Sequence, residues 1–511
     1  MGMDKTTQAP SGLGKQRILG IRRGIEKESL RTHSNAALAI SPHPAALGSA
    51  LTHPHITTDF SESQIELITG VHAGIQDCLD ELRQVQKYTL QSMGSDMLWA
   101  SSMPCELPAD EDIPLGQYGH SNVGLAKTVY RSGLGYRYGR CMQTISGIHY
   151  NWSLPDVSSQ DYFGLIRNFR RHSFLLLYLF GASPTVCSSF VEGRSHPLKA
   201  MGLNTMGLPY ATSLRMGRLG YQSDAQSALA VSYNSLEGYG ASLQHALTAP
   251  YPAYEAIGVR AADGSYRQLG TSLLQIENEF YGTIRPKRVI FQGERPLHAL
   301  RERGVEYVEV RLMDLDPFEP LGINAQTLRF LDVFLLYCLT QPSPDDTPQE
   351  IAAMARNQQR VAERGREPGL ELERDEKPIG LAVWGEEIVK ALAPIATALD
   401  AAHGTNNYSL SLVMAEQGLR NPDTLPSARV LRAIEKSAEG TFASFIQAQS
   451  LQIKTTELSQ ALTASELAHF QKLADISHID QARKEAADSM SFEQYLQQYL
   501  SPDRLGTPAA R

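Results

Sequence analysis

The sequence predicts an α+β fold, in which an antiparallel sheet packs against helices and is followed by a helical C-terminal region. Four short segments, far apart in the chain, alternate apolar and polar residues with the period of a β-strand. Beyond residue 379 this alternation ends, and apolar residues recur at helical spacing instead. Strands that are apolar on one face and polar on the other are typical of antiparallel sheets covered by helices on one side.

The four strand-like segments carry carboxylates or a histidine at alternating positions. They are residues 24–28, residues 57–60 continuing to 64–68, residues 142–152 and residues 305–311. Successive side chains of a strand point to opposite faces, so residues two apart share a face. The pairs that should share a face are Glu26 with Glu28, His149 with Asn151, and Glu309 with Arg311.

If these strands belong to one sheet, its inner face gathers five carboxylates and a histidine, namely Glu26, Glu28, Asp59, Glu66, Glu309 and His149. Such negative charge cannot stay unpaired in a half-buried site, and divalent cations bound through oxygen would compensate it. A single glutamate pair is more typical of a solvated strand face, and a lone histidine of a hydrogen-bonded strand residue. Apolar residues on the opposite face, such as Ile25 and Leu67, recur in all four segments and favour a metal site.

Basic residues lie between these strands. Residues 127–131 end in Tyr130 and Arg131 and precede the glycine-rich residues 132–137. Residues 284–288 (IRPKR) predict a basic turn, which follows a further acidic alternation at residues 275–281. Three cations in one turn repel each other unless they face solvent or an anion such as phosphate, and this stretch alone leaves both interpretations open. The sequence contains no glycine–lysine phosphate loop and no GxGxxG unit, so a nucleotide would have to be held in another way.

Composition narrows the class of protein. The chain has 511 residues, a net charge of −8 and a pI near 6, which gives no footprint for binding nucleic acid. The longest apolar run, residues 174–180, is too short to span a membrane and predicts a buried helix. Residues 1–13 show no hydrophobic signal segment, and the five cysteines lack metal-ligand spacing. We therefore expect a cytoplasmic protein with reduced thiols and neither nucleic-acid nor membrane partners.

Changes in composition divide the chain into four parts. They are a flexible N-terminus (1–17), a catalytic core (18–340), a polar surface insertion or linker (341–378) and a helical region packed on the core (379–511). Within the polar part, Pro348 and Pro368 bracket a predicted surface helix at residues 349–366. In the helical region, Thr463 and Glu466 have the spacing of a capping box that opens a helix.

Several longer motifs resemble the proteobacterial type of glutamate–cysteine ligase. They are residues 24–31 (GIEKESLR), 43–53 (HPAALGSALTH), 56–62 (ITTDFSE), 142–151 (MQTISGIHYN), 281–288 (YGTIRPKR) and 304–311 (GVEYVEVR). They keep the family's order from about residue 18 onward, densely to about residue 324. The resemblance implies a glutamine-synthetase-like antiparallel sheet. It also implies the reaction in which ATP phosphorylates the γ-carboxyl of glutamate and the amine of cysteine then displaces phosphate.

The resemblance also implies roles for individual residues. Those matching magnesium-binding positions are Glu26, Glu28, Asp59, Glu66, His149 and Glu309. Those matching the glutamate and cysteine pockets are Phe60, Tyr130, Gln143, Arg215, Tyr221, Tyr281 and Arg311. Arg131 and Arg311 are expected to act in catalysis, on the phosphoryl group and on the glutamate carboxylate respectively. The expected ATP-binding residues are Lys127, Arg131, Arg285, Lys287 and Arg288.

The implied cofactor is Mg²⁺, although an imidazole is an unusual magnesium ligand, so His149 could also admit Mn²⁺ or contact ATP. The implied partners are L-glutamate, L-cysteine and ATP, with glutathione as a feedback inhibitor because it contains the γ-glutamylcysteine unit. Two alternatives stay open at this stage. One is a related ligase that couples glutamate to another small amine, and the other is a catalytically silent paralogue that binds glutamate or nucleotide.

Overall fold

The computed structural model describes residues 13–104, 106–220, 229 and 231–506. At the centre of this part of the chain, strands form one sheet in the order β2 (Ile56–Thr58), β3 (Gln64–Ile68), β1 (Arg22–Thr32), β5 (Ile148–Ser153), β10 (Tyr307–Met313) and β9 (Ile284–Lys287). The short strand β4 (Met97–Leu98) pairs with the end of β1. Every pairing in this sheet is antiparallel, which confirms the predicted fold class.

The strand register decides which side chains meet. Glu26 lies opposite His149, and Glu28 lies opposite Glu66. Glu309 lies opposite Asn151. Because directly paired residues of antiparallel strands share a face, strands from distant parts of the chain bring their acids to one side of the sheet.

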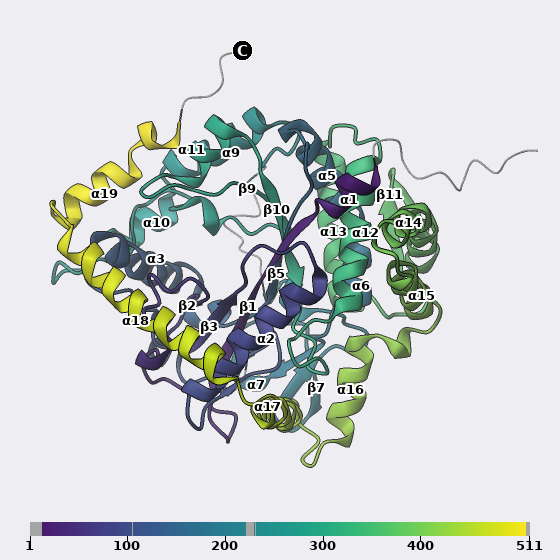
Figure 1. The fold of residues 1–511 in the computed structure, drawn as a ribbon, viewed down its shortest axis with the longest axis horizontal. Coiled ribbons are helices and arrows are strands. Elements are labelled where there is room, and N and C mark those ends of the chain that lie inside the picture. Colours follow the sequence, from purple (N-terminus) through teal and green to yellow (C-terminus); the bar gives the residue numbers. More distant parts are fainter. Residues whose placement is uncertain (1–12, 105, 221–228, 230, 507–511) are drawn as a thin grey trace, which may run out of the picture.

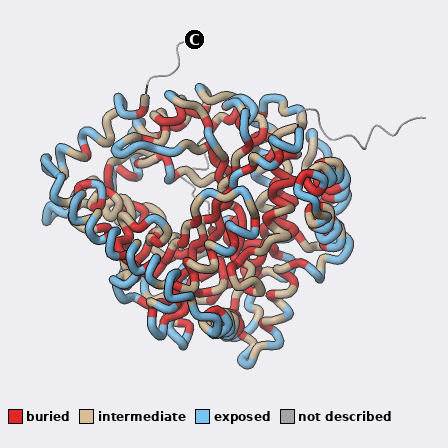
Figure 2. The backbone as a smooth tube through the Cα atoms, viewed as in Figure 1, coloured by how far each residue is buried: buried red, intermediate tan, exposed pale blue. Residues whose placement is uncertain are grey.

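Helices cover the other side of the sheet (Figure 1). Helices α2 (Ile75–Ser92), α5 (Ser159–His172) and α6 (Phe174–Phe180) contact the strands, and α12 (Ala325–Thr340) packs against α2 and α5. The strands supply Ile25, Leu67, Tyr150 and Val308 to this core, all fully buried. The buried residues concentrate around the sheet and these helices in Figure 2. This layer removes one face of the sheet from water and leaves the acidic face for chemistry.

A buried ion pair ties this helical layer to the sheet. Nη2 of Arg23, on β1, lies 2.8 Å from Oδ2 of Asp332 on α12. The hydroxyl of Tyr150 donates to Oδ1 of Asp332 at 2.7 Å, and Nε of Arg23 donates to that hydroxyl at 3.2 Å. Both charges are thus paired and hydrogen-bonded, as burial of an ion pair requires.

The C-terminal region is helical, as predicted. Its helices are α14 (Leu381–His403), α15 (Asn407–Arg420), α16 (Pro426–Lys436), α17 (Phe442–Ser459), α18 (Ala464–Ala486) and α19 (Phe492–Leu500). Helices α14 and α15 pack on α12, on the right of Figure 1, whereas α18 and α19 cross to the opposite side. The predicted capping box is present, with the Thr463 side chain accepting from the backbone of Glu466 and the Glu466 side chain accepting in return. None of the described helices is long and apolar enough to cross a membrane.

Smaller elements complete the fold. They are α1 (Lys15–Leu19), α3 (Asn122–Tyr138), α4 (Arg140–Gln143), α7 (Ser188–Val191), α9 (Leu236–Thr248), α10 (Pro252–Ile257), α11 (Pro296–Arg303), α13 (Pro348–Arg364) and the strands β6 (Thr185–Cys187), β7 (Lys199–Gly202), β8 (Thr205–Gly207), β11 (Glu371–Arg374) and β12 (Lys377–Gly380). Helix α1 includes residues 15–17, which the sequence assigned to a flexible tail. Its Arg17 donates from Nε to the carbonyl of Pro155 at 3.0 Å.

Three local predictions were wrong. Residues 142–152 are not one strand, because the Asp110 carboxylate accepts from the backbone of Arg140 and Cys141 and caps the short helix α4. Residues 284–288 are not a turn, since residues 284–287 form β9 at the sheet edge, where a proline costs no ladder hydrogen bond. Residues 275–281 contain a 3-10 helix at Glu277–Glu279 in place of alternating strand structure.

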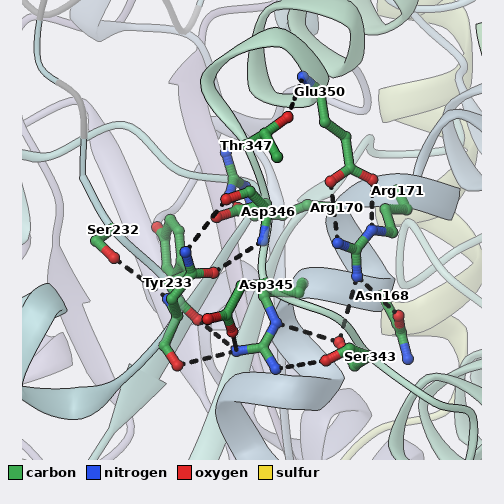
Figure 3. A network of polar contacts seen from close by, with 12 residues as sticks. Asn168, Arg170, Arg171, Ser232, Tyr233, Ser343, Asp345, Asp346, Thr347 and Glu350 are labelled. Carbon is green, nitrogen blue, oxygen red and sulfur yellow. Dashed lines mark hydrogen bonds and ion pairs between the residues drawn. The ribbon is translucent and has the colours of Figure 1, made fainter. Parts of the chain in front are cut away.

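The polar residues after position 341 are anchored to the core by arginines of α5 (Figure 3). Nη1 of Arg170 lies 2.6 Å from Asp346, and Nε of Arg171 lies 2.6 Å from Glu350. Arg167 donates to the carbonyl of Ser343 at 2.8 Å. The predicted helix is present as α13, and its inner side is buried at Val361. The polarity of this segment therefore reflects ion pairing with α5 as well as contact with solvent.

We expect Asp332→Ala to lower the free energy of unfolding by roughly 3–5 kcal/mol, because it leaves the Arg23 guanidinium buried without its partner. Denaturant titration followed by circular dichroism measures this change. Asp423→Ala is the control, since its side chain is 84% exposed and lies 3.9 Å from Arg432, and it should cost less than about 1 kcal/mol. Equal losses for the two variants would contradict the role assigned to the buried pair.

Candidate active site

The acidic face of the sheet has its tightest cluster at Glu26, His149 and Glu309. One ligand atom from each of these residues lies within 4.8 Å of the others. Nδ1 of His149 is 3.0 Å from Oε2 of Glu26, and Nδ2 of Asn151 donates to Oε1 of Glu26 at 2.9 Å. Nε2 of His149 lies 3.5 Å from Oε1 of Glu28. The other oxygen of Glu28, Oε2, accepts a hydrogen bond from the backbone N–H of Gly147 at 2.8 Å. Three of the predicted acids, Glu26, Glu28 and Glu309, therefore converge on His149.

Two of these carboxylates resist ionisation. Burial, followed by the charge of Asp59, raises the pKa of Glu28 to about 8. Burial, together with the charges of Glu26 and Asp59, raises the pKa of Glu66 well above its ordinary value. Like charges held close together in a dry site disfavour each other's ionised form. Around Glu28 and Glu66, the acidic face therefore lacks the positive charge that would favour their ionised forms.

Glu309, on the other side of the cluster, is in contrast held in its ionised form. Burial opposes ionisation of Glu309, but the charges of Lys287 and Arg311 hold its pKa well below the ordinary value. Nζ of Lys287 lies 3.3 Å from Oε1 of Glu309, and Nη1 of Arg311 lies 3.1 Å from Oε2. Burial and the charge of Arg311 lower the pKa of His149, so its ring stays neutral and able to act as a ligand.

Asp59 and the cations of α3 form a second part of the site. Nε of Arg131 donates to the carbonyl of Asp59, and Nη1 donates to the carbonyl of Lys127 at 3.0 Å. The ring of Tyr118 lies beneath both cations, 4.4 Å from the Arg131 guanidinium and 5.1 Å from Nζ of Lys127. Its hydroxyl donates to the carbonyl of Asp59 at 2.8 Å. Tyr118 thus acts as a platform that no feature of the sequence indicated.

A small cavity beside Asp59 is lined by two of the predicted pocket residues. Gln143 donates from Nε2 to the Tyr281 hydroxyl at 3.1 Å, and both residues line this cavity with Asp59. Tyr130 is partly buried near them, where burial and the charge of Glu279 raise its pKa. Phe60 is almost fully buried and belongs to the adjoining core. Tyr221 lies outside the described residues.

A larger cavity of about 280 Å³ adjoins the edge strand β9. Three of the five predicted nucleotide-binding cations, Arg285, Lys287 and Arg288, line it, whereas Lys127 and Arg131 do not. Its remaining wall is partly apolar and includes Tyr239, Leu243, Val289, Ile290, Leu297, Leu300 and Tyr307. Tyr307 is two residues from Glu309 on β10, so strand alternation could have indicated its place on this face. The guanidinium of Arg288 is held by the carbonyl of Arg303 and by Glu306.

Three further charged residues that the sequence singled out are buried in the structure. Glu277 and Glu279, from the acidic alternation, do not join the acidic face, because Arg295 and Arg137 pair with them at 2.7 and 2.8 Å. Arg215, which its local sequence would have made a surface cation, is fully buried. Its Nη2 donates to the carbonyl of Arg311 at 2.8 Å, and a Cβ at Gly147 would lie only 2.0 Å from that nitrogen.

Comparison with known proteins places the chain among ligase enzymes. The structure is similar to that of a glutamate–cysteine ligase of Francisella tularensis, solved in complex with AMP, with a TM-score of 0.89 and 36% identity over 94% of this chain and 97% of that one. A bifunctional glutathione synthetase of Pasteurella multocida matches with a TM-score of 0.71 and 26% identity, over 90% of this chain and 57% of that one.

Sequence comparison narrows the class to one family. The family model for glutamate-cysteine ligase matches residues 12–361. Glutamate–cysteine ligases of Saccharophagus degradans and Alcanivorax borkumensis are 48% and 47% identical to the chain, covering 94% of it and 94% and 96% of their own lengths. The chain belongs to the glutamate–cysteine ligase family, which confirms the resemblance seen in the motifs.

The raised pKa of Glu28 makes stability depend on pH. A carboxyl that binds its proton more tightly in the folded state stabilises the protein below its unfolded pKa, and this contribution is lost as pH rises toward the folded value of about 8. In EDTA we therefore expect the free energy of unfolding to fall between pH 5 and pH 8, at up to roughly 1.4 kcal/mol per pH unit for one group, and the melting temperature to fall with it. Glu28→Gln should reduce this fall. Glu371→Gln, at an exposed position, should not, and identical pH profiles for the two variants would contradict the assignment.

Proposed function

We propose that this protein joins the γ-carboxyl of L-glutamate to the amine of L-cysteine while ATP is converted to ADP and phosphate. The observation that carries this proposal is the acidic face with its basic rim, in which Glu26, His149 and Glu309 converge beside Arg311 and Lys287. A carboxylate is a poor acyl donor, so the reaction has to activate it by phosphorylation before the amine attacks. Both steps bring negative groups together and need fixed positive charge around them.

The acidic face fits a divalent cation. Nε2 of His149 is buried and has no hydrogen-bond partner among the described residues, and it faces Oε1 of Glu28. The raised pKa values of Glu28 and Glu66 indicate a place where added positive charge would be stabilising. The residues that would hold Mg²⁺, or Mn²⁺ through the imidazole, are Glu26, Glu28, Asp59, Glu66, His149 and Glu309. Such an ion, when bound, would neutralise phosphate oxygens and polarise them toward transfer.

The residues of the basic rim have complementary tasks in this proposal. Arg311 is fixed by Glu309 at 3.1 Å and would grip the carboxylate of glutamate. Arg131 and Lys127, held over Tyr118, would stabilise the phosphoryl group in transfer. The cavity beside β9 would take the nucleotide, with its apolar wall for the base and Arg285, Lys287 and Arg288 for the phosphates. Glutathione contains the γ-glutamylcysteine unit, so it should compete with glutamate for its pocket.

Release of ADP tests the proposal directly. The wild-type protein is incubated with glutamate, ATP and Mg²⁺, together with cysteine, 2-aminobutyrate, alanine or methylamine. We expect cysteine to give the highest kcat/KM. Faster turnover with another amine would favour a related ligase, and no turnover with any amine would favour a silent binding protein.

Removing one charge from the acidic face should stop the reaction without unfolding the protein. We expect Glu26→Gln and Glu309→Gln each to lower kcat on the order of 10²-fold or more, by loss of transition-state charge stabilisation. Glu302→Gln, exposed on α11, is the matched control and should keep the parent rate. Rates within about threefold of the parent, equal to roughly 0.6 kcal/mol, would remove Glu26 and Glu309 from the active site.

The cavity beside Asp59, which Tyr281 lines, should select the acceptor. Serine should be a poorer acceptor than 2-aminobutyrate, because its hydroxyl loses water without a dedicated partner at a cost of about 1–3 kcal/mol. Arg215→Ala should lower kcat/KM for cysteine, 2-aminobutyrate and serine by similar factors, whereas Tyr281→Ala should change the ranking of these three acceptors. The measurement is kcat/KM for cysteine, 2-aminobutyrate and serine, with Tyr210→Ala, at an exposed position, as the control. An unchanged ranking in Tyr281→Ala would place the acceptor elsewhere.

A further inference from the structure

The last part of the chain docks on the loops that lead to the active site. This C-terminal arm, residues 464–506, consists of α18, α19 and the short helix η6 (Pro502–Leu505). It begins beside α2, where Gln84 donates to Glu466 at 3.0 Å, and then passes the loop before β2, where Oγ of Ser477 accepts from the backbone of Ser49 at 2.8 Å. It ends beside α11, where Arg301 donates to the carbonyl of Leu505 at 2.9 Å. Between these points it runs along α3, on the left of Figure 1.

Two carboxylates of the arm cap the start of α3. Oε1 of Glu485 accepts from the backbone N–H of His120 at 2.8 Å, and Oδ2 of Asp488 accepts from that of Asn122 at 2.5 Å. The Asn122 side chain donates back to the carbonyl of Met490 at 3.0 Å. The first N–H groups of a helix have no partner within the helix, and negative charge there also interacts favourably with the helix dipole. Ser121 is the N-cap of α3 and its side chain accepts from the backbone of Gly124, so the arm adds a hold on the residues at either side of this cap.

A glycine makes this contact possible. Gly119 has a φ of +76°, and a Cβ at this position would lie 2.0 Å from Nε2 of Gln481 and 2.2 Å from Oε1 of Glu485. A side chain here would displace the ends of the Gln481 and Glu485 side chains, and with them the hydrogen bond from His120 to Glu485. The close approach thus depends on a residue type that tolerates both the positive φ and the lack of space.

The loop that the arm holds carries catalytic groups on both sides. Tyr118 immediately precedes Gly119, and its ring supports Lys127 and Arg131 from below. Arg131, further along α3, reaches the carbonyl of Asp59. Tyr118, Lys127 and Arg131 lie within one short stretch of chain. A shift of this loop would therefore move all three together.

The arm makes a second, apolar contact with the same helix. Leu496 of α19 is buried in a small core with Ala126 of α3 and Leu269. Tyr130 packs against this core with Phe492. This contact keeps the arm on α3 even when a carboxylate is removed, so the contribution of the capping carboxylates can be measured separately from folding.

We propose that Asp488 and Glu485 are positioning residues for the reaction, which act through the 118–122 loop to set Lys127, Tyr130 and Arg131 against Asp59. This inference rests on the proposed function, since it assigns those three residues to substrate and phosphoryl binding. It gives the C-terminal region, in which the sequence showed no site chemistry, a part in the active site.

The test compares Asp488→Ala, Glu485→Ala and the double variant with Asp480→Ala. Asp480 lies on α18 and pairs only with Arg483 of its own helix among the described residues, at 3.0 Å. We expect the double variant to lose on the order of 10- to 100-fold in kcat, as a displacement of about 1 Å can cause, with a melting temperature close to that of the control. Asp488→Asn and Glu485→Gln, which keep an acceptor oxygen, should restore most of the rate. A lower melting temperature with unchanged kcat would show a structural role only and would overturn the proposal.

A double-mutant cycle identifies the residue through which the arm acts. In an Arg131→Lys background, the additional effect of removing the two carboxylates should shrink to within about threefold, because coupled residues are not additive. Fully additive losses would overturn the proposed route through α3. If the wild-type protein showed no ligase activity at all, the proposed function would fail first. An active wild type whose arm variants match the control would refute only the present inference.

Discussion

The candidate active site depends on holding carboxylates of like charge together on one face of an antiparallel sheet. Glu28 and Glu66 are direct neighbours across two strands, and the charge of Asp59 acts on both. Such an arrangement costs free energy unless cations approach it. The sheet can hold it because the opposite face packs against α2, α5 and α6 and fixes the register. The free energy gained by packing one face of the sheet against these helices thus offsets the repulsion between carboxylates on the other face.

Three of the buried acids outside this face each form an ion pair with an arginine. Asp332 pairs with Arg23, Glu277 with Arg295 and Glu279 with Arg137, each at 2.7 or 2.8 Å. The charges of these acids are balanced within the protein. On the acidic face Glu309 also has cations beside it, Lys287 and Arg311, so the contrast is with Glu28 and Glu66. Glu28 and Glu66 remain short of positive charge, as their raised pKa values show.

The family relationship and the geometry agree on the kind of enzyme. Strands from residues 22–32, 64–68, 148–153 and 307–313 deliver the matched motif residues to one face. The cavity beside β9 gathers Arg285, Lys287 and Arg288 at the edge of the same sheet. The C-terminal arm then reaches round to α3 and its cations. Residues distant in the chain therefore meet at one place, and its chemistry depends on how accurately the sheet and the arm fix them.

The sequence by itself determined that the strands have one polar face, that Glu26 shares a face with Glu28 and Glu309 with Arg311, and that the C-terminal region is helical. These follow from local periodicity, which the backbone imposes on neighbouring residues. Only the tertiary structure decided that residues 284–287 form an edge strand, that Glu277 and Glu279 belong to ion pairs, and that Tyr118 supports the cations. Asp110 capping α4 and Asp488 capping α3 were equally invisible, because each depends on partners tens to hundreds of residues away. Periodicity encodes the face to which a side chain points, whereas its partner is set by packing between distant elements.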